Sequence, residues 1–391
     1  MISLAPYRVV LASPELRYLF GASIVGRLPI GMTGLAILLL VQSASQSFAA
    51  GGATTGCYVA GLACVAPAIG RVIDRRGPRT MLMVCAMLFP ASLAALLAAV
   101  SLRAPSVAIF ACAGLAGASF PPITVCMRTY LRQRVTEASL STAYSLDSVL
   151  IETMFIVGPL LVALFVAFAS ATAAVWFAAG SALIGVFLFL RSSALRQWRI
   201  EPRTHATLLG PLAQRRFVTL ILVVVCYAIA FGLTELGAAA YAAEAGRPAL
   251  AGVFLGLMSV GSAFGGLAYG SAHWHTPLLR QFSATLAIMG AGLAVLAAPW
   301  QLAAFALLSI LAGVVMAPAL IIQSMLVAKT AKAEHTTEAF TWSSSALLAG
   351  VGLGRALGGI VAEVWRSPAA FAAAGVAALT AAAGAFWLSR R

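Results

Sequence analysis

The stretch GRVIDRRGPRT, residues 70–80, separates two long apolar runs, 50–70 and 79–101. A helix that crosses a bilayer needs about 20 mainly apolar residues, and each run is long enough. The stretch itself holds four arginines and one aspartate. It therefore predicts a short charged loop between two membrane helices.

The composition of the whole chain extends this prediction. Of 391 residues, 62% are hydrophobic and 9% are charged, whereas a soluble domain has roughly 25% charged residues. A chain this apolar is predicted to be an all-α integral membrane protein with several spans. The six cysteines all fall within predicted spans, which argues against a disulfide framework and against a metal site.

Apolar runs long enough to cross a membrane recur along the chain. We predict twelve spans, at 18–43, 50–70, 79–101, 105–127, 138–166, 171–190, 217–240, 249–271, 281–299, 301–327, 338–362 and 367–388.

The basic residues predict how these spans are oriented. If both termini are cytoplasmic, Arg103, Arg247 and Arg366 fall in outer loops and Arg27 and Arg355 fall inside spans, which leaves 20 of the 25 Lys and Arg on the inner side. This excess follows the positive-inside rule. It also explains the net charge of +14 through short loops, so that no nucleic-acid partner is needed.

The chain also repeats itself at about half its length. Thr136-Glu137-Ala138 aligns with Thr337-Glu338-Ala339 at an offset of 201, and Gly56, Gly70 and Pro122 align with Gly252, Gly266 and Pro318 at an offset of 196. Parallel six-span repeats are typical of transporters built from two halves. We therefore predict an N-terminal six-helix half (1–190), a basic cytoplasmic linker (191–216) and a C-terminal six-helix half (217–391).

The loop at residues 70–80 resembles the signature of the major facilitator superfamily. The matching positions, all in the loop after the second of twelve spans, are Gly70, Asp74, Arg75, Gly77 and Arg79. The resemblance implies the fold of that superfamily and a loop that acts as a conformational latch rather than a substrate site. Glycines allow close approach and a tight turn, and Asp74 is expected to pair with neighbouring arginines. The second copy, residues 265–281, keeps Gly266 but has Gly270 in place of the acid.

Two further elements bear on the direction of transport. Gly158-Pro159 resembles part of a motif of antiporters in the superfamily, although Met154 replaces a glycine of the extended pattern. The fourth span lacks a mid-membrane arginine followed by glutamine, and Arg128 lies near its inner end. The pattern favours efflux by an antiporter but leaves import open.

Charged residues inside the spans are the candidate functional residues. Counted at 1.5 Å per residue, Arg27 in span one and Asp147 in span five lie at a similar depth, about 14 Å from the inner side. We expect them to pair, either as a structural link between helices or as part of the transport machinery. A five-residue step turns a helix by about 140°, so Glu152 faces a different direction from Asp147.

Removal from water favours the protonated form of a carboxyl group. Glu152 and Asp147 are therefore the candidates for proton coupling, and Glu152 is favoured because no cation lies at its depth in its own half. Arg27 and Arg355 are candidates for binding a substrate anion or for a charge pair; Arg355 has only Glu363 as a nearby acid. Glu235 near the outer end of span seven and Tyr144 in span five complete the substrate candidates.

Glycines at four-residue spacing predict close helix approaches. They occur in span two (Gly52 and Gly56), span eight (Gly252, Gly256, Gly261 and Gly265) and span eleven (Gly350, Gly354 and Gly358). The resemblance implies that spans two and eleven, and spans five and eight, meet across the two halves.

Together these features predict a secondary active transporter of a small organic solute, working by alternating access and proton-coupled, with efflux favoured. A proton-coupled importer or facilitator of a small organic anion or nutrient is the alternative. No nucleotide-binding loop occurs, so a proton gradient rather than a cofactor is expected to supply the energy. A receptor with a transporter fold and a membrane-embedded enzyme are the alternatives from other classes. We expect a monomer in the bacterial inner membrane that contacts the lipid bilayer and its substrate.

Overall fold

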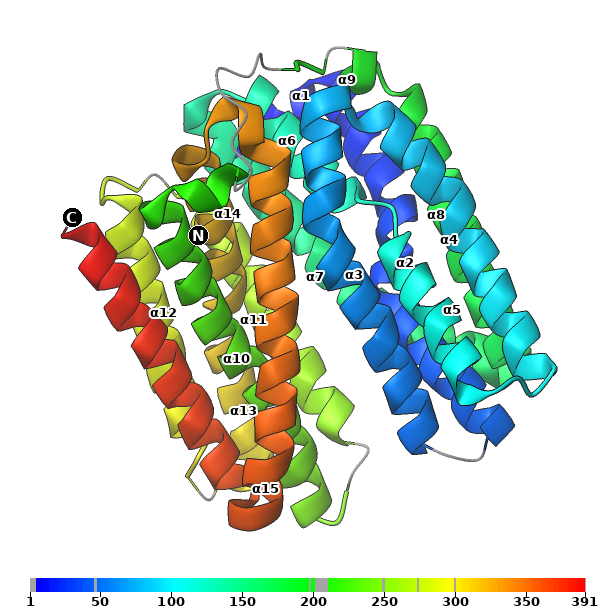
Figure 1. The fold of residues 1–391 in the computed structure, drawn as a ribbon. Coiled ribbons are helices and arrows are strands. Elements are labelled where there is room, and N and C mark those ends of the chain that lie inside the picture. The colour runs from blue at the N-terminus through cyan, green and yellow to red at the C-terminus, as the bar shows by residue number, and fades with distance from the viewer. Residues whose placement is uncertain are drawn as a thin grey trace.

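A computed structural model describes residues 5–45, 48–196, 198–200, 210–247, 250–272, 274–298 and 300–390 of the chain. Within these residues it contains 12 helices long and apolar enough to cross a membrane. Their positions match the twelve predicted spans, and the all-helical membrane fold is thereby confirmed (Figure 1).

The first group of helices holds spans one to six. In chain order these are α1 (Ala5–Ala12), α2 (Pro14–Ser45), α3 (Phe48–Arg76), α4 (Pro78–Ser101), α5 (Ser106–Ala118), α6 (Ile123–Arg134), α7 (Glu137–Phe168), α8 (Ala171–Arg191) and α9 (Ser193–Arg196). Helices α5 and α6 together form span four, and α1 and α9 are too short to cross a membrane.

The second group holds spans seven to twelve. It contains η1 (Gly210–Ala213), α10 (Arg215–Glu244), α11 (Leu250–Ser271), α12 (Leu278–Val295), α13 (Leu302–Gly313), α14 (Met316–Thr330), η2 (Ala333–His335) and α15 (Thr336–Ser389). Helix α15 covers spans eleven and twelve and breaks at Arg366, whose φ is 64°. Of the predicted linker 191–216, residues 197 and 201–209 lie outside the described part of the chain.

Span four differs from its prediction as one helix over 105–127. Helix α5 ends at Ala118, and α6 begins after Pro121 and Pro122 and continues to Arg134. A proline has no N–H to donate, so two in succession interrupt the helix. The extra length of α6 places Arg128 inside a helix rather than at the edge of a loop.

The charged loop after span two is shorter than predicted. Helix α3 runs to Arg76, so Gly70, Asp74 and Arg75 are helical and only Gly77 connects α3 to α4. Arg75 and Arg76 form the last turn of α3, where positive charge is favourable to the helix dipole. Gly77 has φ 78°, a conformation that favours glycine.

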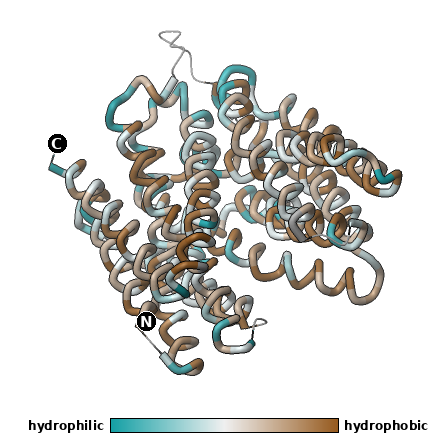
Figure 2. Tube along the Cα trace, turned by 60° about the horizontal axis from the view of Figure 1, so that its bottom comes forward, coloured by the Kyte–Doolittle hydropathy of each residue, from teal (hydrophilic) through white to brown (hydrophobic). Residues whose placement is uncertain are grey.

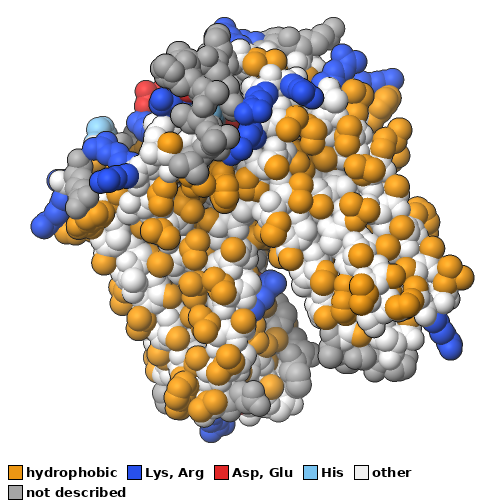
Figure 3. All heavy atoms as spheres, in the orientation of Figure 1, with side chains coloured by type: hydrophobic (Ala, Val, Ile, Leu, Met, Phe, Trp, Pro, Cys, Tyr) orange, Lys and Arg blue, Asp and Glu red, His pale blue; other side chains and the backbone are white. Residues whose placement is uncertain are grey.

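The two groups lie side by side, meet at one end and diverge toward the other (Figure 1). Figure 1 shows them meeting at the end that carries α1, α6 and α9 and diverging toward the opposite end. Figure 2 shows apolar residues along most of each helix, and Figure 3 shows the Lys and Arg side chains gathered mainly where the groups meet. We call this the basic end and the opposite one the open end. Figure 3 also shows the cleft that separates the groups from the open end inward.

Two pairs of helices form the largest contacts between the groups, and smaller ones join α7 to α14 and α6 to α15. Helix α3 packs against the first part of α15, and α7 packs against α11. These are spans two and eleven, and five and eight, the pairs that the family resemblance implies.

Within each group, the first and fifth spans cross at a pair of glycines. A Cβ on Gly158 of α7 would lie 2.6 Å from the carbonyl carbon of Gly31 in α2, and one on Gly232 of α10 would lie 2.8 Å from the carbonyl carbon of Gly354 in α15. Such contacts leave no room for a side chain, so these crossings depend on glycine.

The close helix approaches predicted at the glycines of spans two, eight and eleven were partly wrong. Gly350, Gly354 and Gly358 pack against α10, and Gly261 and Gly265 pack against the α13–α14 region, so both sets act within the second group. Gly52, Gly56, Gly252 and Gly256 have no atom of the described residues within 4 Å of a Cβ. Sequence spacing identifies a small-residue face but not the helix that it meets.

We predict that Gly158→Ala lowers the apparent melting temperature of the purified protein. The added methyl group would have to displace the backbone of α2, and such overpacking costs roughly 1–3 kcal/mol. Gly56→Ala is the matched control, because its methyl group enters open space. Equal melting temperatures for the two variants, measured by thermal unfolding in detergent, would contradict the assignment of this crossing.

Candidate functional site

Asp74 links the two groups at the basic end. Its carboxylate, at the end of α3, accepts hydrogen bonds from the backbone N–H of Thr337 (2.9 Å) and of Glu338 (2.7 Å). These amides lie in the first turn of α15, where backbone N–H groups lack partners within their own helix. Asp74 thus caps a helix of the other group, and its negative charge also suits the positive end of that helix.

An ion pair reinforces this contact. Arg71, one turn before Asp74, donates from Nη2 (2.6 Å) and Nε (3.0 Å) to Oε1 of Glu338. A Cβ on Gly70 would lie 3.0 Å from Cα of Glu338, so this glycine allows α3 to approach α15 closely. We call Gly70, Arg71, Asp74 and Glu338 the latch.

The expected pairing of Asp74 with arginines of its own loop was wrong. Its hydrogen bonds go to backbone amides, and Arg75 and Arg79 are exposed, with no ion pair among the described residues. Arg71 and Glu338 were not among the sequence candidates. Glu338 belongs to the repeated Thr-Glu-Ala triplet, and that repeat was the signal that could have identified it.

The second copy of the loop motif, at the end of α11, is joined to the first group by a different set of hydrogen bonds. Gly270 stands where the acid would be, and its carbonyl accepts a hydrogen bond from Thr142 Oγ1 of α7 (2.8 Å). Beside it, the hydroxyl of Tyr7 from α1 donates to the carbonyl of Leu267 in α11 (2.7 Å) and lies 2.8 Å from Ser145 Oγ in α7. Burial raises the pKa of the Tyr7 phenol above its ordinary value, so the group is neutral. A tyrosine from the N-terminal helix thus joins α7 to α11 at the basic end.

A buried charge cluster lies within the first group. Arg27 of α2 donates from Nη1 to Oδ1 of Asp147 in α7 (2.6 Å), and Arg128 of α6 donates from Nε to Oδ2 of the same carboxylate (3.0 Å). Arg27 and Asp147 are almost fully buried, and Arg128 is 12% exposed. Sequence depth brought Arg27 and Asp147 together but missed Arg128, because span four was predicted to end at residue 127.

Tyr144 lies next to this cluster on the side of the basic end. Its hydroxyl donates to the backbone carbonyl of Arg128 (3.2 Å), and its ring packs edge-on against Phe340 of α15, with 6.3 Å between the ring centres. The side chain is buried between the two groups of helices. In this conformation Tyr144 belongs to the contact that closes the basic end, and it does not line the open cleft.

Glu152 joins the two groups farther toward the open end. Its Oε1 accepts a hydrogen bond from Ser262 Oγ of α11 (2.9 Å), and Ser259 supplies a second hydroxyl beside it. The side chain is half-buried, and no Lys, Arg or His of the described chain lies within ion-pair distance of it. Glu152 and Asp147 thus have different partners, as the helix geometry predicted.

Arg355 and Glu235 form a pair within the second group. Arg355 Nε of α15 donates to Glu235 Oε2 of α10 (2.6 Å), and both side chains remain partly exposed. The sequence left Arg355 without an evident partner apart from Glu363, whose side chain lies outside the described part of the structure. Arg355 is therefore neutralised by Glu235, which weakens its case as a free anion site.

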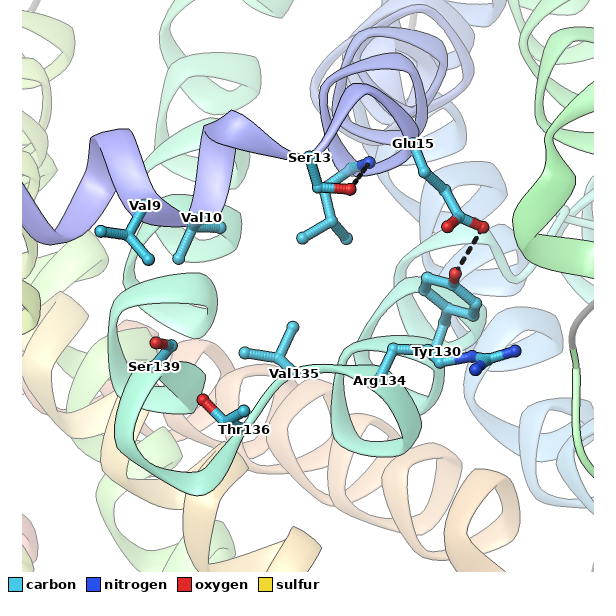
Figure 4. Close-up of a pocket in the computed structure, with 10 residues that line it drawn as sticks. Val9, Val10, Ser13, Glu15, Tyr130, Arg134, Val135, Thr136 and Ser139 are labelled. Carbon is cyan, nitrogen blue, oxygen red and sulfur yellow. Dashed lines mark hydrogen bonds between the residues drawn. The ribbon is translucent and has the colours of Figure 1, made fainter.

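A cavity of about 290 Å³ opens at the surface of the basic end, away from these charges. Figure 4 shows its wall, where α1 and the start of α2 face α6 and α7 and where Tyr130 donates a hydrogen bond to Glu15 (2.7 Å). Since it lies outside the cleft, we assign it no substrate. No cluster of three or more His, Cys, Asp or Glu residues suited to a metal occurs among the described residues.

Comparisons with known proteins find one matching protein family and several solved structures of similar fold. The family model described as "Major Facilitator Superfamily" matches residues 19–299. Among solved structures, the chain is similar to the human organic anion transporter MFSD10, at 17% identity and a TM-score of 0.76, with 95% of this chain and 100% of that chain covered. A comparison with curated protein sequences finds no match.

Two other solved structures are also similar. A bacterial homologue of the iron transporter ferroportin, in an outward-facing state, shares 14% identity and a TM-score of 0.80, over 96% of this chain and 99% of that one. The E. coli fucose:proton symporter shares 13% identity and a TM-score of 0.71, over 96% and 98%. At these identities the likeness concerns the fold.

We predict that Asp74→Asn opens the basic end. The amide cannot accept from both backbone N–H groups as the carboxylate does, and a hydrogen bond to a charged group contributes about 1.5–3 kcal/mol. Spin labels at the exposed positions 80 and 280, in a variant without native cysteines, report the separation of the two groups there. We expect a longer distance to gain population in Asp74→Asn.

Arg75→Ala is the matched control, because Arg75 is exposed and makes no ion pair in the described chain. It should keep the distance distribution of the parent protein. An Asp74→Asn distribution identical to that of the control would contradict the role of the latch.

Proposed function

The chain belongs to the major facilitator superfamily, and on this premise we propose that it exports a small organic solute by alternating access, in exchange for protons. Members of this family are secondary transporters, not enzymes. The substrate, the coupling ion and the direction are the parts that we propose.

The proposed orientation follows from the charges. The basic end faces the cytoplasm, in agreement with the positive-inside rule, and both termini lie on that side. The latch then closes the cytoplasmic end while the cleft opens outward. We propose the inner membrane of a bacterium as the location, and a monomer as the working unit because one chain holds both groups of helices.

Alternating access is supported by one face of α3, on which every seventh residue faces α15. Gly70 lies against Glu338, and the carbonyl of Ala63 accepts a hydrogen bond from Ser345 Oγ (2.7 Å). One further step of seven along both helices pairs Gly56 with Gly352, and in the described part of the chain no atom lies within 4 Å of a Cβ on either. The two helices therefore touch along the latched part of this face and are apart beyond it.

The same pattern recurs on α11, at the positions related by the repeat. Gly266 lies near Val149 of α7, and Ser259 lies near Glu152. Gly252, the next step, has no described atom within 4 Å of a Cβ. Both helix pairs thus have a closed inner part and an open outer part lined by glycine. We propose that segments 1–190 and 217–391 rock about the middle of these faces, closing the outer part as the inner part opens.

Glu152 is the residue that we propose for proton coupling. It has only hydroxyl partners among the described residues, and the bond to Ser262 crosses between the two moving units. An ionised carboxylate accepts a stronger hydrogen bond than a neutral one, so rocking that breaks this bond depends on whether Glu152 is protonated. Asp147, by contrast, is engaged by two guanidinium groups.

Export is favoured by the Gly158-Pro159 element of span five, which resembles part of an antiporter motif. Import of an organic anion together with protons is the second candidate. It is favoured by the two arginines that share Asp147, because they leave an excess of positive charge in the first group.

We predict that Glu152→Gln uncouples solute movement from proton movement. Glutamine keeps the size and the hydrogen-bonding capacity of the side chain but cannot release a proton. In liposomes that enclose a pH-sensitive dye, the solute-dependent proton flux should fall to the protein-free background, while exchange of labelled for unlabelled solute continues.

Glu137→Gln is the control, since Glu137 is an exposed acid at the start of the same helix. It should keep the parent protein's proton flux, and the sign of that flux decides between export by exchange and import by symport. Undiminished proton flux in Glu152→Gln would rule out Glu152 as the coupling group.

A further inference from the structure

The charge cluster of the first group has a neutral counterpart in the second. Tyr227 of α10 donates its hydroxyl hydrogen to Oε1 of Gln323 in α14, and Gln323 Nε2 donates to Ser343 Oγ in α15 (2.5 Å). Three spans of the second group, the seventh, tenth and eleventh, are thereby tied together. The corresponding spans of the first group, the first, fourth and fifth, are tied by Arg27, Arg128 and Asp147.

The two sets also correspond in sequence. Tyr227 follows Arg27 by 200 residues, Gln323 follows Arg128 by 195, and Ser343 follows Asp147 by 196. Gln323 lies within one residue of the position that the offset of 196 gives for Arg128, and Tyr227 lies within one residue of the position that 201 gives for Arg27. The offset of 201 found for spans five and eleven places Asp147 at Leu348, so Ser343 corresponds to Asp147 by its span and not by its register. We call the two sets the charged triad and the neutral triad.

The charges in the first group could serve to tie the helices together or to take part in transport, and the neutral triad distinguishes these two roles. The neutral triad ties the three equivalent helices together with uncharged groups, although its central member is Gln323 of the tenth span, whereas Asp147 of the fifth span is central in the charged triad. Charge is therefore not needed to tie three such helices together. Ionic groups inside a membrane are costly. We therefore infer that the charges of the first triad have a function besides holding the helices together.

The charged triad is incomplete as an ion cluster. It holds two guanidinium groups and one carboxylate, and no other acidic side chain of the described chain lies within ion-pair distance of either arginine. Nε and Nη2 of Arg27 are buried and have no hydrogen-bond partner among the residues that the structure describes. The cluster thus has one excess positive charge and two unused donors.

The position of the triad suits a substrate site. Tyr144 and Phe340, which pack together across the two groups, lie about one helical turn toward the basic end from Asp147. The triad therefore lies next to the closure of the basic end, and its partly exposed member is Arg128.

We propose that the charged triad binds the anionic group of the substrate, and that the substrate is an organic anion such as a carboxylate. The anion supplies the missing negative charge and accepts hydrogen bonds from Arg27, an arrangement that a planar guanidinium favours. This inference rests on the proposed function, in which the cleft carries a small organic solute, and it adds the chemical class of that solute.

The test compares acids with their neutral amides on the full chain in detergent. The probes are benzoate with benzamide, nicotinate with nicotinamide and succinate with succinamide, with benzylamine as a cation. We expect at least one acid to raise the melting temperature while its amide and benzylamine do not. Replacement of Arg27 by Lys should weaken binding of that acid roughly tenfold or more, because the fork of donors is lost.

The decisive variant copies the neutral triad into the first group, as Arg27→Tyr, Arg128→Gln and Asp147→Ser together. The second group shows that such a triad can tie these helices, so we expect a folded protein that no longer responds to the acid. Arg247→Gln is the control, because Arg247 is an exposed arginine outside the spans, and it should keep the response. An acid response that survives in the triple variant would overturn the proposal, as would stabilisation by the amides or benzylamine in place of the acids.

Failure of this proposal remains distinct from failure of the transport proposal. If no acid stabilises the protein, the anionic class is wrong. Proton flux that depends on Glu152 and on a neutral or cationic solute would still support proton-coupled transport.

Discussion

The conformation of this protein depends on one carboxylate that caps a helix of the opposite group. The first amides of a helix lack partners in their own helix, and in a membrane protein such groups need a partner from elsewhere. Asp74 supplies it to α15, and Arg71 and Gly70 allow α3 to lie against the same turn. With the groups held at this end, the cleft can open only at the other. The second copy of the motif has no acid and uses the neutral hydroxyl of Tyr7, so the two closures rest on different chemistry.

The same asymmetry extends into the membrane. The first group holds its central junction with two arginines and an aspartate, whereas the second uses a tyrosine, a glutamine and a serine. Helix α7 carries both charged features of the proposed mechanism. Asp147 faces α2 and α6, and Glu152 faces α11 across the boundary between the groups. One rigid helix thus connects the proposed substrate site with the proposed proton site.

The sequence predicted the parts that depend on composition and on periodicity along one helix. The twelve spans follow from apolar length, and the meeting of Arg27 and Asp147 follows from equal depth. Prediction from the sequence failed for contacts that depend on the position of a second helix. Arg128 was missed because a span was taken to end with its apolar run, although α6 continues to Arg134. Arg355 pairs with Glu235, and Asp74 accepts hydrogen bonds from backbone amides. Both partners are set by how the helices pack, which residue spacing in the sequence does not determine. The glycines of α3 were assigned to a contact that this conformation leaves open.

The central claim is that the outer parts of α3 and α15 close as the latch opens. A direct measurement is disulfide formation between Gly56→Cys and Gly352→Cys in a protein whose six native cysteines are replaced. Bridging requires Cα atoms within about 4.4–6.8 Å. The account predicts little cross-linking with the latch intact and strong cross-linking once Asp74→Asn is added, while the out-of-register pair Gly56→Cys and Gly359→Cys stays uncross-linked. Equal cross-linking with and without Asp74→Asn would contradict the account.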